Sequence, residues 1–313
     1  MRRRNGQSTK SSIPRFAAIH YFLWKWLFAG AACVAILANS GCVTAAHSSV
    51  SSKALGCVYY MDGAGGGGVL VNWGRGVREG IRAAGLRMDY REFRWQTGFG
   101  AVADHQASNG YKRHAARRLA QDVVAYRRNH PTASVDFIAL SAGTVVAAYA
   151  LEELPDGCSV DNVVFLASSM SADFEFTPAL THVRDHVYVY TSTRDGILNS
   201  LVPLTGTADR RFCGKDIVGL CGVHHPGQLT AEQTRQYDKV VHVPWTPAFD
   251  AVGNHGGHLG GATPGFVCEH IAPTIRPNIR VALAGAGSAA WHMMVSQRIG
   301  SWSGHTSRRS DNQ

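Results

Sequence analysis

The sequence lacks several patterns that mark whole classes of protein. Charged side chains make up only 17% of its 313 residues and hydrophobic ones 45%, a balance that allows a buried core. It contains no H-E-x-x-H helix and no C-x-x-C pair, so neither a metalloprotease nor a thiolate zinc site is indicated. It also lacks a basic stripe with interleaved aromatic residues. We therefore expect no metal, no cofactor and no nucleic-acid partner.

The cysteine count excludes a fully paired disulfide framework. There are seven cysteines, an odd number, and five of them follow residue 42. These five are Cys57, Cys158, Cys213, Cys221 and Cys268. Cys213 and Cys221 bound a short segment and can pair in an oxidising compartment, with buried or inert thiols as the alternative.

Positive charge is concentrated at the start of the chain. Residues 1–41 hold six Lys or Arg and no Asp or Glu, so the net charge of +9 falls to +3 for the remainder. An apolar run over 26–38 has the length of a signal-peptide core and is short for a bilayer span. Residues 39–42, Asn-Ser-Gly-Cys, resemble a bacterial lipobox with Asn where Leu is usual, which makes Cys42 a candidate for lipidation. A signal-peptidase site at 43–45 is the alternative, and either reading predicts export to the cell envelope, membrane-anchored or secreted.

The rest of the chain alternates between strand and helix patterns. After a linker over 42–54, apolar runs predict strands at 57–61, 88–95, 135–140, 163–167, 187–191 and 240–243. Helical periods lie between them, at 70–81, 116–124 and 143–154, with a last helix over 264–272. This order predicts an α/β domain over 55–275 with a mostly parallel central sheet and helices on both faces. Residues 276–313 form a tail of uncertain order.

The most informative segment joins a buried strand to an Ala-rich helix through Ser141. A nucleophile elbow needs this context, because strand and helix pass so closely that the residues two before and two after the serine must be small. Here those residues are Ala139 and Gly143, so the usual G-x-S-x-G has Ala at its first position. An ordinary strand–helix turn is the alternative.

Candidates for an acid and a base follow Ser141 in the chain. Asp195 comes just after a predicted strand, and His258 lies in a glycine-rich loop after the last strand. A triad on this kind of sheet runs in the order Ser, Asp or Glu, His. Asp173 is the alternate acid, with Asp209 as a weaker one, and His255 is the alternate base.

A glycine-rich loop over 63–68 follows the first strand and suits an oxyanion hole. Backbone N–H groups form such a hole, one from the residue after the nucleophile and one from an early loop. We expect the donors to be Ala142 and Ala64. The irregular region 196–238 and the loop 96–110, with Phe99 and Trp95, are candidates for a lid or for pocket walls.

Together, the 63–68 loop, the Ser141 elbow, Asp195 and His258 resemble the α/β-hydrolase superfamily in its esterase and lipase branch. The resemblance covers residues 55–275 and is most specific at the elbow. It implies a mostly parallel sheet, a Ser-His-Asp triad and hydrolysis of an ester, thioester or amide through an acyl-enzyme. The expected partner is a small-molecule or lipid ester, with a membrane surface added if Cys42 is lipidated. Departures are Ala139 and the absence of a His-Gly before the oxyanion loop.

Three other functions compete with hydrolysis. Residues 63–68 also satisfy G-x-G-x-x-G, and Asp89 lies 21 residues beyond Gly68, as in dinucleotide-binding folds. A metal site would use His255 and His258 with one of His224, His225 or His242. The third alternative is a hydrolase-like protein that has lost activity and binds a ligand.

Overall fold

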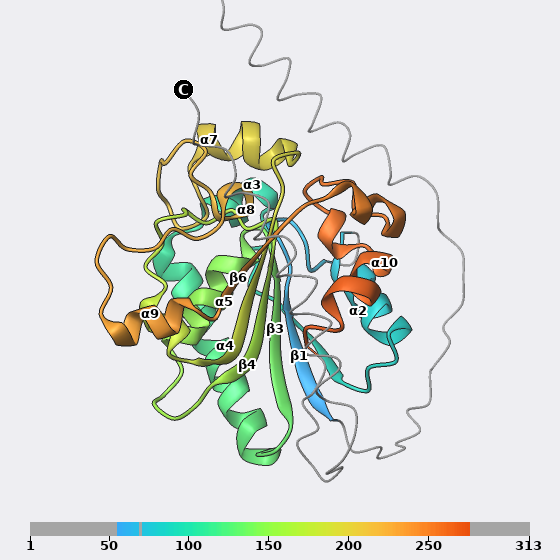
Figure 1. Cartoon of the computed structure of the whole chain (residues 1–313), viewed down its shortest axis with the longest axis vertical. Helices are drawn as coiled ribbons and strands as arrows, with labels where there is room; N and C mark the ends of the chain where they lie inside the picture. The colour runs from blue at the N-terminus through green and yellow to red at the C-terminus, as the bar shows by residue number, and fades with distance from the viewer. Residues whose placement is uncertain (1–54, 69–70, 276–313) are drawn as a thin grey trace, which may run out of the picture. The chain divides into compact units, whose positions relative to one another are not determined.

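The computed structural model describes residues 55–68 and 71–275, and in them six strands form one sheet (Figure 1). The strand order is β2-β1-β3-β4-β5-β6, and every pairing is parallel. The strands are β1 (Gly56–Met61), β2 (Asp89–Phe93), β3 (Ser134–Leu140), β4 (Val160–Leu166), β5 (Val183–Thr191) and β6 (Val240–Pro244). The predicted α/β class is confirmed.

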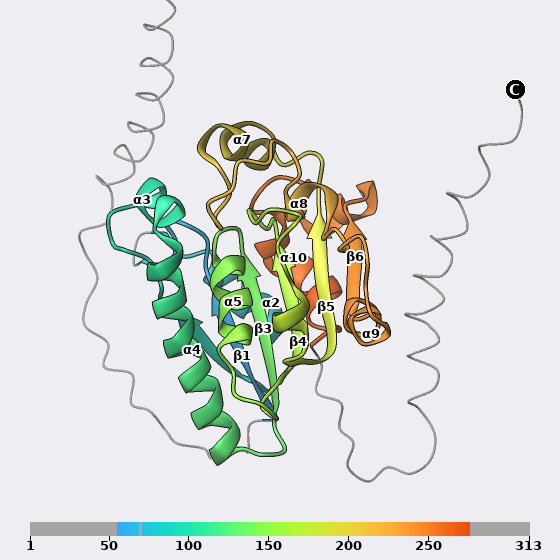
Figure 2. The ribbon, with the colours of Figure 1, turned by 90° about the vertical axis from the view of Figure 1, so that its left-hand side faces the viewer.

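Helices cover both faces of this sheet (Figures 1 and 2). On one face α4 (Asn109–Asn129) and α5 (Gly143–Glu152) share a core with inward side chains such as Phe137. On the other face α2 (Gly74–Ala83) and α10 (Pro264–Phe266) pack with Ile138 and its neighbours. Because the central strands are covered twice, β4 is buried along its whole length. This explains the continuous apolar runs from which the strands were predicted.

Several short helices lie where the sequence predicted loops or irregular chain. They are α3 (Ala101–Gln106), α6 (Thr177–Leu180), η1 (Ile197–Leu201), α7 (Val202–Thr205), α8 (Val218–Cys221), α9 (Ala231–Tyr237), η2 (Pro247–Val252) and η3 (Gly260–Ala262). Each has at most seven residues, too few turns to display a helical period. The helix predicted over 264–272 is α10 followed by a π-helix, η4 (Val267–Ile271).

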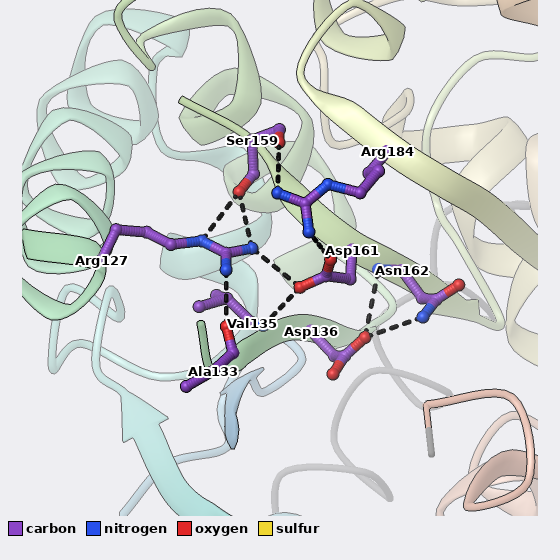
Figure 3. A network of polar contacts seen from close by, with 8 residues as sticks. All are labelled: Arg127, Ala133, Val135, Asp136, Ser159, Asp161, Asn162 and Arg184. Carbon is purple, nitrogen blue, oxygen red and sulfur yellow. Dashed lines mark hydrogen bonds and ion pairs between the residues drawn. The ribbon is translucent and has the colours of Figure 1, made fainter. Parts of the chain in front are cut away.

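Two strands, β4 and β5, begin three or four residues earlier than predicted, and their added residues include polar ones. β4 starts at Val160 rather than 163, and β5 at Val183 rather than 187, because charged residues interrupt the apolar pattern there. Figure 3 shows how they are satisfied: Asp161 binds Arg127 (2.7 Å) and Arg184 and accepts the Val135 N–H (2.7 Å). This network lies at the amino ends of the strands and leaves the carboxyl ends free for the site.

Asp136 belongs to the same buried network. Its Oδ1 accepts the backbone N–H and the side-chain amide of Asn162, at 3.1 Å and 2.9 Å. Burial raises the pKa of Asp136 well above its usual value, although these hydrogen bonds oppose the rise. The Asp136 carboxyl, fully buried in β3, is therefore part of the core.

The chain divides into two units, residues 1–52 and 53–313. All of the first unit lies outside the described residues, as do the candidate lipidation site Cys42, the 42–54 linker and the 276–313 tail. Within the described ranges, no helix combines the length and the apolarity that a membrane crossing requires.

Candidate active site

The structure brings Ser141, Asp195 and His258 into one hydrogen-bonded chain. His258 Nε2 lies 2.9 Å from Ser141 Oγ, and His258 Nδ1 lies 2.7 Å from Asp195 Oδ2. The three residues come from segments 117 and 63 residues apart. They meet because each follows a parallel strand, β3, β5 or β6, whose carboxyl ends share one edge of the sheet. Their side chains are largely shielded from water, with exposures of 1% for Asp195 and 11% for His258.

Ser141 occupies a sharp turn between β3 and α5. Its φ of +51° lies in the left-handed region, which is uncommon for a residue with a side chain. The turn is held by a 2.9 Å hydrogen bond from the Ser141 N–H to the carbonyl of Leu166 on the next strand. Strain that persists under such restraint is typical of functional positions. This backbone presents Oγ at the sheet edge, towards His258.

Gly143 lets the helix after Ser141 approach β1 closely. A Cβ placed on this residue would lie 2.5 Å from the carbonyl oxygen of Met61 and 2.6 Å from that of Asp62. Both obstacles are backbone atoms and cannot rotate away. The small residue two positions after the serine is therefore required by packing, as the elbow pattern predicts. Ala139, two positions before, is fully buried in β3.

We expect Gly143→Ala to lower the free energy of unfolding by about 1–3 kcal/mol, because the added methyl group must push backbone apart. Urea unfolding of the variant measures this change. Gly227→Ala is the matched control, since a Cβ there meets nothing within 4 Å, and it should shift the value by less than about 0.5 kcal/mol. Equal stability of both variants would contradict the close approach.

Asp195 is positioned by the chain that follows it. Its Oδ1 accepts the N–H groups of Ile197 and Leu198, both at 3.0 Å, and this leaves Oδ2 for His258. Every acceptor oxygen of this carboxylate thus has a donor. A carboxylate held in this way fixes the orientation of the imidazole.

The alternate acid and base lie elsewhere. His255 pairs with Asp250 (2.8 Å) on the exposed surface, and Asp173 pairs with His224 (2.9 Å). Asp209 is buried but accepts the N–H of a residue in the loop after β4. None of these side chains bonds to Ser141 or His258 among the described contacts. The structure therefore brings together Ser141, Asp195 and His258, and it leaves the alternate acids and base away from the serine.

Two buried carboxylates, which the sequence pattern does not reveal, hold the glycine loop after β1. Asp62 accepts the N–H groups of Gly63 (2.8 Å) and Gly67 (2.9 Å), and Asp104 of α3 accepts that of Gly65 (2.8 Å). Burial raises the pKa of Asp62, while the hydrogen bonds it accepts oppose the rise. Three N–H groups of the loop are thereby occupied, and the loop is fixed beside the serine.

Among the described residues, two of the backbone N–H groups near Ser141 for which no acceptor is found are the predicted donors. One belongs to Ala64, whose neighbours in the loop donate to carboxylates or to the Gly63 carbonyl. The other belongs to Ala142, which precedes the first turn of α5 and has no helical acceptor. Gly63 lies close to the serine, since a Cβ built on it would come within 3.2 Å of Ser141 Cβ. Both were predicted as donors from the sequence, and the N–H of Gly143, the first residue of α5, lacks a helical acceptor in the same way.

A cavity of about 240 Å³ opens beside the triad. Its lining is mostly apolar and comes from the glycine loop, α3, η1, α7 and the 258–259 loop: Gly63, Ala64, Trp73, Ala101, Val102, His105, Gln106, Ser141, Ile197, Leu201, Val202, Thr205, His258 and Leu259. Both regions expected as walls take part. The expected aromatic residues do not, because Phe99 is 88% exposed and Trp95 is buried with its Nε1 bonded to the Asp62 carbonyl.

Polar contacts around a buried lysine join the two walls. Lys112 Nζ donates to the carbonyls of His105 (2.8 Å), Ala107 (2.9 Å) and Ala208 (2.6 Å). His105 Nε2 lies 2.9 Å from the Gly206 carbonyl, so this nitrogen carries the proton. Burial lowers the pKa of Lys112 to about 8 and also lowers the pKa of His105. The cavity therefore has walls that are fixed to each other.

The structure also bears on the competing readings. A pyrophosphate would need the N–H groups of the glycine loop, but the carboxylates of Asp62 and Asp104 already accept them. Asp89 begins β2 rather than ending it, unlike a ribose-binding acid. The contacts of the glycine loop therefore do not favour dinucleotide binding.

Cys213 and Cys221, which the sequence allowed to pair, are free thiols in the described structure.

Comparison with known proteins adds little to this geometry. No protein-family model and no curated protein matches the sequence. Among solved structures, the chain is similar to an uncharacterized protein from Bacillus cereus ATCC 10987, with 16% sequence identity and a TM-score of 0.37. That similarity covers 76% of this chain and 67% of the other.

Proposed function

We propose that this protein is a serine hydrolase that cleaves a carboxylic ester through an acyl-enzyme. The observation that carries the proposal is the unbroken line from Asp195 Oδ2 through His258 to Ser141 Oγ, with contacts of 2.7 Å and 2.9 Å, at the wall of an apolar cavity. A serine is a weak nucleophile unless an adjacent base removes its proton, and the base needs a third group to orient it. This arrangement supplies all three roles.

The reaction would proceed in two steps. Ser141 Oγ attacks the ester carbonyl while His258 Nε2 takes its proton, and His258 then donates that proton to the leaving alcohol. Water, deprotonated by the same nitrogen, releases the acid and restores the serine. Asp195 holds the imidazole through Nδ1 and stabilises its charged form. The free N–H groups of Ala142 and Ala64 would bind the tetrahedral oxyanion, because donors placed in advance need no reorganisation.

The cavity favours an ester with an apolar portion. Its wall includes aliphatic side chains from α3 and η1 that are partly open to solvent, with exposures of 77% for Val102, 50% for Leu201 and 40% for Ile197. Apolar residues at a pocket mouth bind apolar ligand surface as water is released. An acyl chain or an apolar alcohol fits this lining better than a charged group. Export and lipidation of Cys42, as expected from the sequence, would bring such a site to lipid esters.

A fluorophosphonate probe tests the proposal, because only an activated serine displaces its fluoride. We expect the full-length protein to be labelled once, with loss of labelling in His258→Ala and full labelling in His255→Ala. The two histidines form a matched pair, since each bonds a carboxylate through Nδ1 at 2.7–2.8 Å and only His258 also reaches Ser141.

Circular dichroism should show that all three proteins are folded. A folded wild-type protein that resists the probe, or equal labelling of the two histidine variants, would overturn the assignment. p-Nitrophenyl esters of increasing acyl length would then report on the cavity, with longer apolar acyl groups expected to be better substrates than acetate.

A further inference from the structure

A second group of reactive side chains lies outside the proposed triad, on the segment that leads to α8 and beyond it. Asp216, Cys221 and His224 offer a carboxylate oxygen, a thiol sulfur and an imidazole nitrogen, all within 4.8 Å of one another. All three residues are exposed. None of them lines the cavity beside Ser141 or contacts the triad. The hydrolase reaction leaves them without a role.

The spacing of the ligand atoms suits a zinc ion. Zinc binds cysteine sulfur at about 2.3 Å and histidine nitrogen at about 2.0–2.1 Å, usually with tetrahedral angles. Two such bonds separate the sulfur and the nitrogen by about 3.5 Å. Cys221 Sγ lies 3.8 Å from His224 Nε2, so a small side-chain rotation would seat an ion between them. A mixed set of sulfur, nitrogen and oxygen donors is also one that zinc accepts.

His224 is already oriented as a ligand. Its Nδ1 lies 2.9 Å from Asp173 Oδ1, so this nitrogen donates to the carboxylate and Nε2 keeps its lone pair. That lone pair is on the side of Cys221. Metal-binding histidines generally carry such a carboxylate on the other ring nitrogen, which fixes the ring and raises its basicity. Asp173, the alternate catalytic acid predicted from the sequence, is therefore bonded to His224 instead of His258.

The backbone holds the ligands in place. The Ala172 N–H donates to the Asp216 carbonyl (2.8 Å), and the His224 N–H donates to the Ala172 carbonyl (2.9 Å). Two ligand residues are therefore tied to a single residue of the loop after β4. The third, Cys221, ends α8, three positions before His224.

Charge supports a cation at this position. The Asp216 carboxylate lies within 4.8 Å of the Cys221 sulfur and of His224, and a second carboxylate, Asp173, contacts His224 Nδ1. A divalent cation at this position would bind the thiolate of Cys221 and release its proton to solvent.

We propose that Asp216, Cys221 and His224 bind a zinc ion, with Asp173 orienting His224 and solvent in the fourth position. The site is independent of ester hydrolysis. It would link α8 to the loop after β4, since its ligands and their support come from both.

Cobalt(II) replaces zinc in such sites and makes them visible, so it is the probe. The full-length protein, stripped of metal and reduced with a phosphine, is titrated with cobalt. We expect a thiolate-to-cobalt charge-transfer band that saturates at one ion per chain and disappears when zinc is added. Cys221→Ser should abolish the band, and His224→Ala should weaken binding at least tenfold. Asp173→Asn should weaken binding about 10–100-fold while keeping the band.

Two variants serve as controls. His255→Ala removes an exposed histidine with a similar carboxylate partner, and Cys268→Ser removes another free thiol. Both should bind cobalt like the wild type. The proposal is overturned if the reduced protein shows no charge-transfer band, or if Cys221→Ser binds cobalt as the wild type does. Loss of binding on oxidation, with recovery on reduction, would support it, because a Cys213–Cys221 disulfide would remove the sulfur ligand.

Discussion

Replacing Ser141 with alanine is expected to lower kcat/KM for an ester substrate by about 10⁴–10⁶-fold. The change removes only Oγ, the atom 2.9 Å from His258 Nε2, and leaves a methyl group in the same turn. The cavity and the free N–H donors persist, so residual hydrolysis by bound water should remain slightly above background. The loss should fall on kcat, because the apolar walls that bind substrate are unchanged.

If Ser141 and His258 act as one unit, removing both should cost no more activity than removing Ser141 alone. Once the serine is gone, the base has no proton to remove, so Ser141→Ala with His258→Ala should be no slower than Ser141→Ala alone, within about threefold. Steady-state kinetics on a p-nitrophenyl ester measures both. Ser200→Ala is the control, an exposed serine in η1 whose hydroxyl bonds only to a backbone carbonyl. More than a tenth of wild-type activity in Ser141→Ala would contradict the proposed nucleophile.

Asp195→Asn is expected to lower kcat by about 10⁴-fold although it changes a single atom. The expected loss follows from the backbone N–H groups that bond to Asp195. The N–H groups of Ile197 and Leu198 both point at Oδ1 and will hold the amide oxygen there, so the amide NH₂ must face His258 Nδ1. That nitrogen then becomes an acceptor, and the proton moves to Nε2. The imidazole can no longer accept a proton from the serine.

The rate of fluorophosphonate labelling and kcat should fall together in this variant. Raising the pH should not restore either, because the imidazole is held in the wrong tautomer rather than protonated. Asp173→Asn is the matched control, since this carboxylate also bonds a histidine Nδ1, at 2.9 Å, but away from the serine. If the two Asn variants lose activity equally, Asp195 is not the orienting acid.

The parts of the fold that were predictable are those governed by burial. β3 and α5 were readable because both are buried almost throughout, which produces a continuous apolar run and then an Ala-rich helix. Chain order and strand ends narrowed the acid and the base to a few candidates, with Asp195 and His258 preferred over Asp173 and His255, because parallel strands bring their carboxyl ends together. The small residues on either side of Ser141, Ala139 and Gly143, were what predicted the sharp turn at the serine.

Buried polar residues were not predictable. Asp62, Asp104 and Lys112 read as ordinary surface residues, yet each is nearly inaccessible and bonds to backbone. Some of their partners are distant in sequence: the Gly65 N–H is 39 residues from Asp104, and the Ala208 carbonyl is 96 residues from Lys112. No local pattern encodes such a contact. The short helices that form the cavity walls, such as α3 and α7, escaped notice for a related reason, since tertiary hydrogen bonds rather than periodicity hold them.

The order of the proposed triad along the chain has a consequence during synthesis. The nucleophile precedes its base by 117 residues, so at about 5–20 residues per second a growing chain carries the serine for roughly 6–23 s before the histidine is made. A chain that ends just before His258 already contains the six described strands but would lack the proposed base for Ser141. Ester hydrolysis would therefore require that synthesis has passed His258, and chains that end earlier would be inactive.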